Sequence, residues 1–169
     1  MKVAWGIVAI AFAIGFLLCF ILPNSASYMD IDIHRKGAKV LVLSCIDPRF
    51  TERLAHFLIN DKDVHADYDL VNLAGASLGV LQNDYPSWKP MFYDHLNIAV
   101  NLHNIKEVWV FDHLDCGMYK TTFGIESDLD KSIHVNYITE LRKNLAESHP
   151  QLGFRGFVMM TDGHIEKIT

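Results

Sequence analysis

Short apolar runs that recur along the chain are the feature that most constrains its fold. The run at Lys39–Leu43 is continuous and rich in β-branched residues, which is typical of a strand that is covered on both faces. The run at Val108–Phe111 likewise has the pattern of a buried strand. The runs predict strands at Lys39–Leu43, Tyr68–Leu73, Glu107–Phe111 and, as the last strand, Phe154–Met160.

The segments between these runs have a different period. They place apolar residues at helical spacing, which predicts helices within Phe50–Asn60, Met91–Asn104 and Ile133–Leu145. The polar segment Lys120–Asp130 is predicted to be irregular. Strands that alternate with helices predict an α/β fold in which helices flank a mostly parallel central sheet.

A long uncharged stretch near the N-terminus stands apart from this pattern. Val3–Leu22 carries no charged side chain, and about 20 apolar residues is the length at which a helix crosses a bilayer. Lys2 lies before the stretch, whereas Asp30 and Asp32 follow it. This asymmetry of charge favours an N-terminus in the cytoplasm and a following domain outside it.

This N-terminal hydrophobic helix is predicted to be a membrane anchor or a signal peptide. Small residues at Ser25–Ser27 suit cleavage by a signal peptidase, whereas the length of the apolar stretch favours a retained anchor. The predicted organisation is an anchor or signal segment over residues 1–27 and a single domain over residues 28–169. The domain would face the outside of the cytoplasm on a membrane anchor, or would be exported to the periplasm after cleavage.

The composition excludes one broad class of partner. The chain has 169 residues, enough for one domain with its own core, and a net charge of -5. No cluster of basic residues occurs in the sequence, so nucleic-acid binding is not expected.

Two of the three cysteines follow predicted strands and are candidates for metal binding. Cys19 lies inside the N-terminal apolar stretch, whereas Cys45 comes after the first predicted strand. His113 and Cys116 follow the third strand and are three positions apart, so one loop can present both to a single ion. Because ligands bind beyond the carboxyl ends of parallel strands, the fold would bring Cys45 to the same edge.

Cys45, His113 and Cys116 suit zinc, because imidazole and thiolate are among its usual ligands. Three protein ligands leave one coordination position open, which is the arrangement of a catalytic zinc rather than a structural one. Zinc lowers the pKa of a bound water to about 7 and so supplies hydroxide at neutral pH. A Cys45–Cys116 disulfide is the alternative, since exported domains often pair their cysteines.

Asp47 and Arg49 lie just beyond Cys45 and are candidate catalytic residues. Asp47 would accept a hydrogen bond from the hydroxide or would occupy the open position itself. Arg49 would hold Asp47 through a bidentate pair and keep it ionised. Away from a ligand cysteine, the same two residues would indicate only an ordinary turn with a surface ion pair.

These motifs resemble those of the β-class carbonic anhydrases. Cys45-Ile46-Asp47-Pro48-Arg49 is similar to the Cys-x-Asp-x-Arg motif of that family, and His113-Leu114-Asp115-Cys116-Gly117 is similar to its His-x-x-Cys-Gly motif. His95–Val100 resembles the helix before the second motif, and Val71–Gly75 resembles the strand end between the two motifs. The resemblance covers the chain from the first predicted strand to the C-terminus.

The resemblance implies a zinc lyase, a carbonic anhydrase that interconverts carbon dioxide and bicarbonate. Cys45, His113 and Cys116 would be the zinc ligands, and Asp47 and Arg49 the catalytic dyad. The family also implies a homodimer or a higher homo-oligomer. Two alternatives stay open: hydrolysis of carbon disulfide or carbonyl sulfide on the same scaffold, and a catalytically silent, membrane-anchored zinc module.

The chain also differs from the family pattern at some positions. Asp112 stands where a glycine commonly precedes the ligand histidine, and Asn72-Leu73 stands where Arg-Asn often precedes Ala-Gly. These differences bear on interface geometry and substrate access more than on metal binding.

Overall fold

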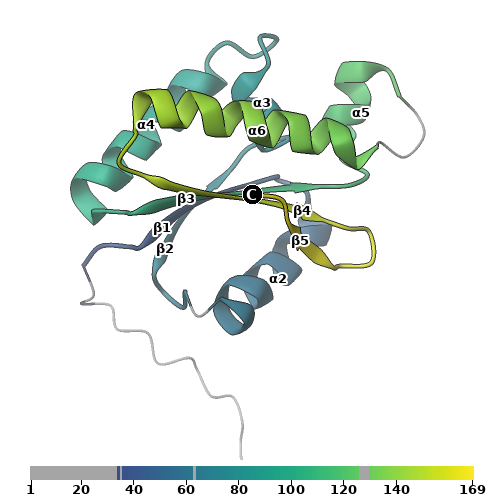
Figure 1. Cartoon of the computed structure of the whole chain (residues 1–169). Helices are drawn as coiled ribbons and strands as arrows, with labels where there is room; N and C mark the ends of the chain where they lie inside the picture. The colour runs from purple at the N-terminus through teal and green to yellow at the C-terminus, as the bar shows by residue number, and fades with distance from the viewer. Residues whose placement is uncertain (1–33, 35, 63, 126–129) are drawn as a thin grey trace, which may run out of the picture. The chain divides into compact units, whose positions relative to one another are not determined.

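A five-stranded sheet lies at the centre of the described region (Figure 1). The computed structural model describes residue 34 and residues 36–62, 64–125 and 130–169. Its strands are β1 (Val40–Ser44), β2 (Tyr68–Asn72), β3 (Glu107–His113), β4 (Gly153–Met159) and β5 (Ile165–Lys167). Their order is β2-β1-β3-β4-β5, and only β4 and β5 pair in antiparallel fashion among these described strands. The prediction of an α/β fold with a mostly parallel sheet is confirmed.

Helices cover both faces of this sheet, as the sequence predicts. They are α2 (Pro48–His56), α3 (Ser77–Leu81), α4 (Trp88–Ile98), α5 (Gly117–Phe123) and α6 (Lys131–Ser148). π-Helical turns at Phe57–Asp61 and Ala99–His103 continue α2 and α4. Figure 1 shows α2 against one face of the sheet, and α3, α4 and α6 against the other.

The packing of β1 explains why its sequence is apolar at every position. Val40 and Val42 pack in the core under α2, whereas Leu41 and Leu43 pack in the core on the opposite face. All four side chains are buried. A strand between two layers of helices has no solvent-facing side, so its residues do not alternate between apolar and polar.

Three short elements are absent from the prediction. Lys120–Asp130 is predicted to be irregular, but its first four residues belong to helix α5. Tyr119 is the only fully buried side chain of this helix. Helix α3 has five residues and strand β5 has three, so neither spans enough sequence to show a period. The prediction of β4 as the last strand is therefore wrong, because β5 follows it after a turn.

The N-terminal predictions concern a different part of the chain. The predicted helix over residues 3–22 and the anchor or signal segment over residues 1–27 lie outside the described residues. Within the described ranges, no helix is both long enough and apolar enough to cross a bilayer. The division of the chain near residue 28 stays a prediction.

Candidate metal centre

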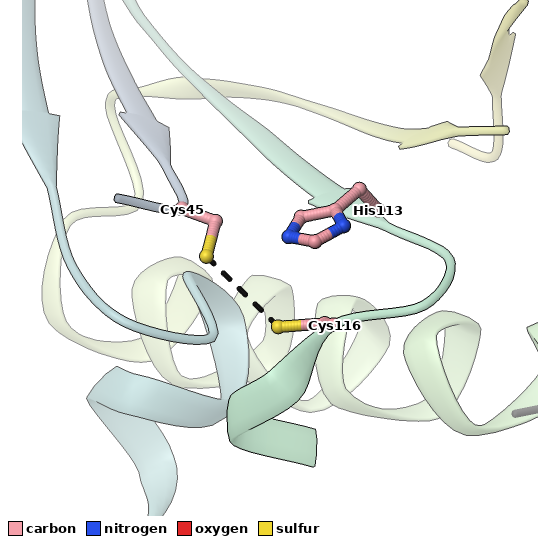
Figure 2. A group of neighbouring side chains, drawn as sticks. All are labelled: Cys45, His113 and Cys116. Carbon is pink, nitrogen blue, oxygen red and sulfur yellow. Dashed lines mark hydrogen bonds between the residues drawn. The ribbon is translucent and has the colours of Figure 1, made fainter. Parts of the chain in front are cut away.

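Cys45, His113 and Cys116 come together at the carboxyl edge of the sheet (Figure 2). Cys45 directly follows β1, and His113 is the last residue of the neighbouring parallel strand β3. Cys116 caps the N-terminus of α5. The ligand atoms of the three side chains all lie within 4.8 Å of one another. The fold thus brings together the three residues predicted as metal ligands, although 71 positions separate the two cysteines.

His113 belongs to a strand rather than to the loop predicted from the sequence. The prediction ends the third strand at Phe111, but β3 continues through Asp112 and His113, which are both 1% exposed. The strand therefore ends two residues later than the sequence predicts. These two side chains are buried because both find polar partners at the carboxyl edge of the sheet.

The geometry of the three side chains fits a zinc ion. The sulfur atoms of Cys45 and Cys116 are 3.9 Å apart and both thiols are free, so the alternative disulfide is not formed. Two zinc–sulfur bonds of about 2.3 Å at the tetrahedral angle would place the sulfurs about 3.8 Å apart. His113 Nδ1 donates to the Leu114 carbonyl at 2.8 Å, which fixes the tautomer and leaves Nε2 for a metal. That Nε2 atom is buried and lacks a hydrogen-bond partner among the described residues.

The surroundings of Cys45 favour its thiolate, the form in which cysteine binds metals. The hydrogen bond from Cys116 is the largest effect on Cys45, and it lowers the pKa of that thiol. Burial raises this pKa, whereas His113 and the Gly75 N–H lower it further. The Gly75 nitrogen lies 3.4 Å from Cys45 Sγ. The same hydrogen bond with Cys45, together with burial, raises the pKa of Cys116. A thiolate beside a thiol is therefore the expected charge state of the metal-free pair.

Asp47 and Arg49 form the bidentate pair predicted from the sequence. Arg49 Nε donates to Asp47 Oδ1 at 3.0 Å, and Nη2 donates to Oδ2 at 2.7 Å. Asp47 also caps α2, because Oδ1 accepts from the Arg49 backbone N–H at 3.0 Å. The side-chain hydrogen bond from Arg49 lowers the pKa of Asp47, so the carboxylate is ionised at neutral pH. Asp47 Oδ2 lies 3.8 Å from His113 Nε2 and so faces the position that a metal would take.

Asp115 is a further residue of the centre that the sequence reasoning missed. Its Oδ2 accepts from Arg49 Nη1 at 2.8 Å, its backbone oxygen accepts from Arg49 Nη2 at 3.2 Å, and Lys120 pairs with its Oδ1. Lys120 and then Arg49 lower the pKa of Asp115 to about 2. Its position between His113 and Cys116 is the only sequence signal for this role, and that signal does not reveal the contact with Arg49.

A mainly apolar cavity of about 220 Å³ opens beside Cys45. It lies between α2 with the π-helical turn that follows it, the carboxyl end of β1, and strand β2. Its apolar walls are formed by Leu54, Ala55, Leu58 and Leu70. The centre therefore has a small hydrophobic space next to one of the three candidate ligands.

Comparison with known proteins places the chain in a family. A family model described as "Putative carbonic anhydrase" matches residues 35–169. An uncharacterized protein of Rickettsia bellii is 33% identical over 135 residues, which are 78% of this chain and 82% of that protein. Residues 35–169, which the family model matches, contain both motifs of the metal centre.

Solved structures of β-carbonic anhydrases have a similar fold. A β-carbonic anhydrase of Sordaria macrospora, one of two described as tetrameric, matches with a TM-score of 0.53 and 13% identity over 95% of each chain. A β-carbonic anhydrase of Aspergillus fumigatus matches with a TM-score of 0.50 and 14% identity over 95% of this chain and 88% of that one. At these identities the likeness is one of fold. The chain belongs to the family described as "Putative carbonic anhydrase", and it has the β-carbonic anhydrase fold that its motifs predict.

Proposed function

We propose that this protein is a zinc-dependent carbonic anhydrase that interconverts carbon dioxide and bicarbonate. The observation that carries the proposal is the convergence of Cys45, His113 and Cys116 beside the Asp47–Arg49 pair. Three ligands of these types leave zinc one open position. A purely structural zinc site would have no use for an ionised carboxylate that faces this position.

The residues of the centre have separate roles in this proposal. Zinc held by Cys45, His113 and Cys116 would supply an activated water at neutral pH. Asp47 would orient that water, because an ionised carboxylate only accepts hydrogen bonds and its Oδ2 faces the metal position. Arg49 would keep Asp47 ionised and away from the metal, because it engages both carboxylate oxygens.

The cavity beside Cys45 suits the proposed substrate. Carbon dioxide is small and carries no net charge, so an apolar niche next to the reacting water is sufficient to hold it. The cavity lined by Leu54, Ala55 and Leu58 offers an apolar space beside Cys45, and this supports carbon dioxide as the substrate.

Stopped-flow measurement of carbon dioxide hydration by zinc-loaded protein tests the proposal. We expect hydration at neutral or alkaline pH that depends on zinc. No hydration at either pH would contradict the proposal. Turnover of carbon disulfide or carbonyl sulfide by the same preparation would then identify the alternative reaction, and no turnover of any of these would leave a silent zinc module.

We also propose that the protein forms a homodimer or a higher homo-oligomer. The Sordaria macrospora relatives are described as tetrameric. Leu70 on the edge strand β2 and Ile98 on α4 are 47% and 51% exposed and line one groove, which supports contact with another subunit. Light scattering across a range of protein concentrations tests this, and a monomer at every concentration would contradict it.

The location of the domain is a separate proposal. We infer from the uncharged stretch over residues 3–22 and its flanking charges that the domain lies outside the cytoplasm, either anchored or exported. A reporter that functions only in one compartment, fused after Thr169, tests the orientation. Resistance to carbonate extraction distinguishes a retained anchor from a cleaved signal peptide, and a cytoplasmic reporter signal would contradict export.

A further inference from the structure

A fully buried polar cluster lies next to the metal centre, and we call it the Asp112 cluster. Its members are Asp112, Ser77, Tyr119 and His134, none more than 1% exposed. Asp112 Oδ1 accepts from the Ser77 backbone N–H at 3.0 Å, and Oδ2 accepts from Ser77 Oγ and from Tyr119 Oη at 2.6 Å each. His134 Nδ1 lies 3.5 Å from Oδ2. Because no member reaches solvent, the cluster acts within the protein rather than on an outside molecule.

The Asp112 cluster connects the two elements that carry the second metal-binding motif. Asp112 directly precedes His113 on β3. Tyr119 lies three positions after Cys116, in the first turn of the helix that Cys116 caps. The hydrogen bond between Tyr119 and Asp112 therefore fixes the start of α5 against the end of β3. It thereby limits how far Cys116 can move from His113.

The same carboxylate connects the segment that contacts the first motif. The Gly75 N–H donates to Cys45 Sγ at 3.4 Å, and the Ser77 N–H donates to Asp112. Ala76 lies between these two donors. Its backbone has φ 42° and ψ -103°, a conformation that residues other than glycine rarely adopt. Such a conformation persists only where its surroundings hold it in place. The bond from Ser77 to Asp112 is one of the contacts that hold the Gly75 N–H against Cys45.

We propose that Asp112 is a positioning residue of the metal centre, whose hydrogen bonds to Ser77 and Tyr119 set the spacing of the three candidate ligands. The inference rests on the proposed binding of zinc by those ligands. Asp112 does not touch the metal position in this proposal. It acts through the backbone segments that hold Cys45, His113 and Cys116.

Tyr119 offers a mild way to perturb this cluster. Burial, followed by the negative charge of Asp112, raises the pKa of Tyr119, so its hydroxyl stays protonated and donates. The ring packs against His134 and Tyr137, with centroid distances of 4.1 and 5.6 Å. Tyr119→Phe keeps this packing and removes one hydrogen bond to the carboxylate.

The experiment compares metal binding by full-length wild-type protein and three variants. Zinc affinity is measured by competition with a chromophoric chelator, and the visible absorption of the Co²⁺-substituted protein reports the coordination geometry. The variants are Tyr119→Phe, Asp112→Asn and, as the matched control, Tyr137→Phe, which removes a neighbouring tyrosine hydroxyl outside the Asp112 cluster. Unfolding by denaturant is measured for each variant to separate stability from metal geometry.

We expect Tyr119→Phe to weaken zinc binding by about tenfold, the lower range for residues that support metal ligands, and to shift the Co²⁺ spectrum. Asp112→Asn should have a larger effect, because its amide nitrogen cannot accept from the two hydroxyls. Tyr137→Phe should match wild type. Wild-type affinity and spectrum in both Tyr119→Phe and Asp112→Asn would overturn the inference alone, even if both variants were less stable. Wild-type protein that binds no zinc would overturn the proposed function and this inference together.

Discussion

Arg49 and Asp115 connect the two sequence motifs of the metal centre. The Arg49 guanidinium donates to Asp115 Oδ2 at 2.8 Å and to the Asp115 backbone oxygen at 3.2 Å. The two residues are 66 positions apart in the sequence. Since Arg49 also holds Asp47, the position of Asp47 depends on the loop between His113 and Cys116. The proposed water-orienting carboxylate is thus aligned by the loop that joins the candidate ligands His113 and Cys116.

Asp115→Asn is expected to slow carbon dioxide hydration only on the order of a few-fold, because exposed ion pairs contribute little. Arg49→Ala should cost more, because an unpaired Asp47 can swing onto the metal and block the open position. Stopped-flow rates at equal zinc content compare the two variants. A wild-type rate for Arg49→Ala would contradict the role assigned to this arginine.

Asp47→Asn is expected to retain zinc but to lose hydration activity on the order of 100-fold. The reason is that an amide NH₂ would donate where the water requires an acceptor. Zinc content and hydration rate are measured on the same preparation. A zinc-loaded Asp47→Asn variant with the full rate would show that Asp47 does not orient the water.

Cys45→Ser is expected to lose most of its zinc, because a hydroxyl is a poor replacement for thiolate as a zinc ligand. Cys19→Ser is the matched control, since Cys19 lies in the N-terminal apolar stretch, and it should keep one zinc per chain. Metal analysis after gel filtration gives both values. Equal zinc content in the two variants would exclude Cys45 as a ligand.

The cysteines of the metal-free protein are expected to differ in reactivity with pH. The pKa of Cys45 is lowered, chiefly by the hydrogen bond from Cys116, so its thiolate persists below the pH at which ordinary thiols become protonated. At about pH 6, where an ordinary thiol with a pKa of about 8.5 is protonated, iodoacetamide should label Cys45 faster than Cys116. Peptide mapping by mass spectrometry identifies the labelled residue, and bound zinc should protect it. Faster labelling of Cys116 would contradict this assignment of charge.

Cys45 and His113 were predictable as neighbours because each lies at the end of a strand that the sequence reveals. Cys45 and His113 follow continuous apolar runs, and the carboxyl ends of parallel strands meet at one edge. Asp47 and Arg49 were predictable as a pair because they are two positions apart and their contact is local. The contact between Asp47 and Arg49 therefore followed from their spacing in the sequence.

Asp112 and Asp115 were not predictable as partners, because their contacts depend on the tertiary fold. Asp112 binds Ser77 across 35 positions, and Asp115 binds Arg49 across 66. Ser77 itself begins α3, a helix too short to leave a periodic pattern. A buried aspartate within an apolar run resembles the end of a strand until its partners are known.

Stopped-flow carbon dioxide hydration by the zinc-loaded wild-type protein tests the central claim most directly. The chain is expected to bind one zinc through Cys45, His113 and Cys116 and to accelerate hydration at neutral or alkaline pH, with loss of activity when a chelator removes the metal. A preparation with one zinc per chain that leaves the hydration rate at the uncatalysed value at both pH values would contradict the account.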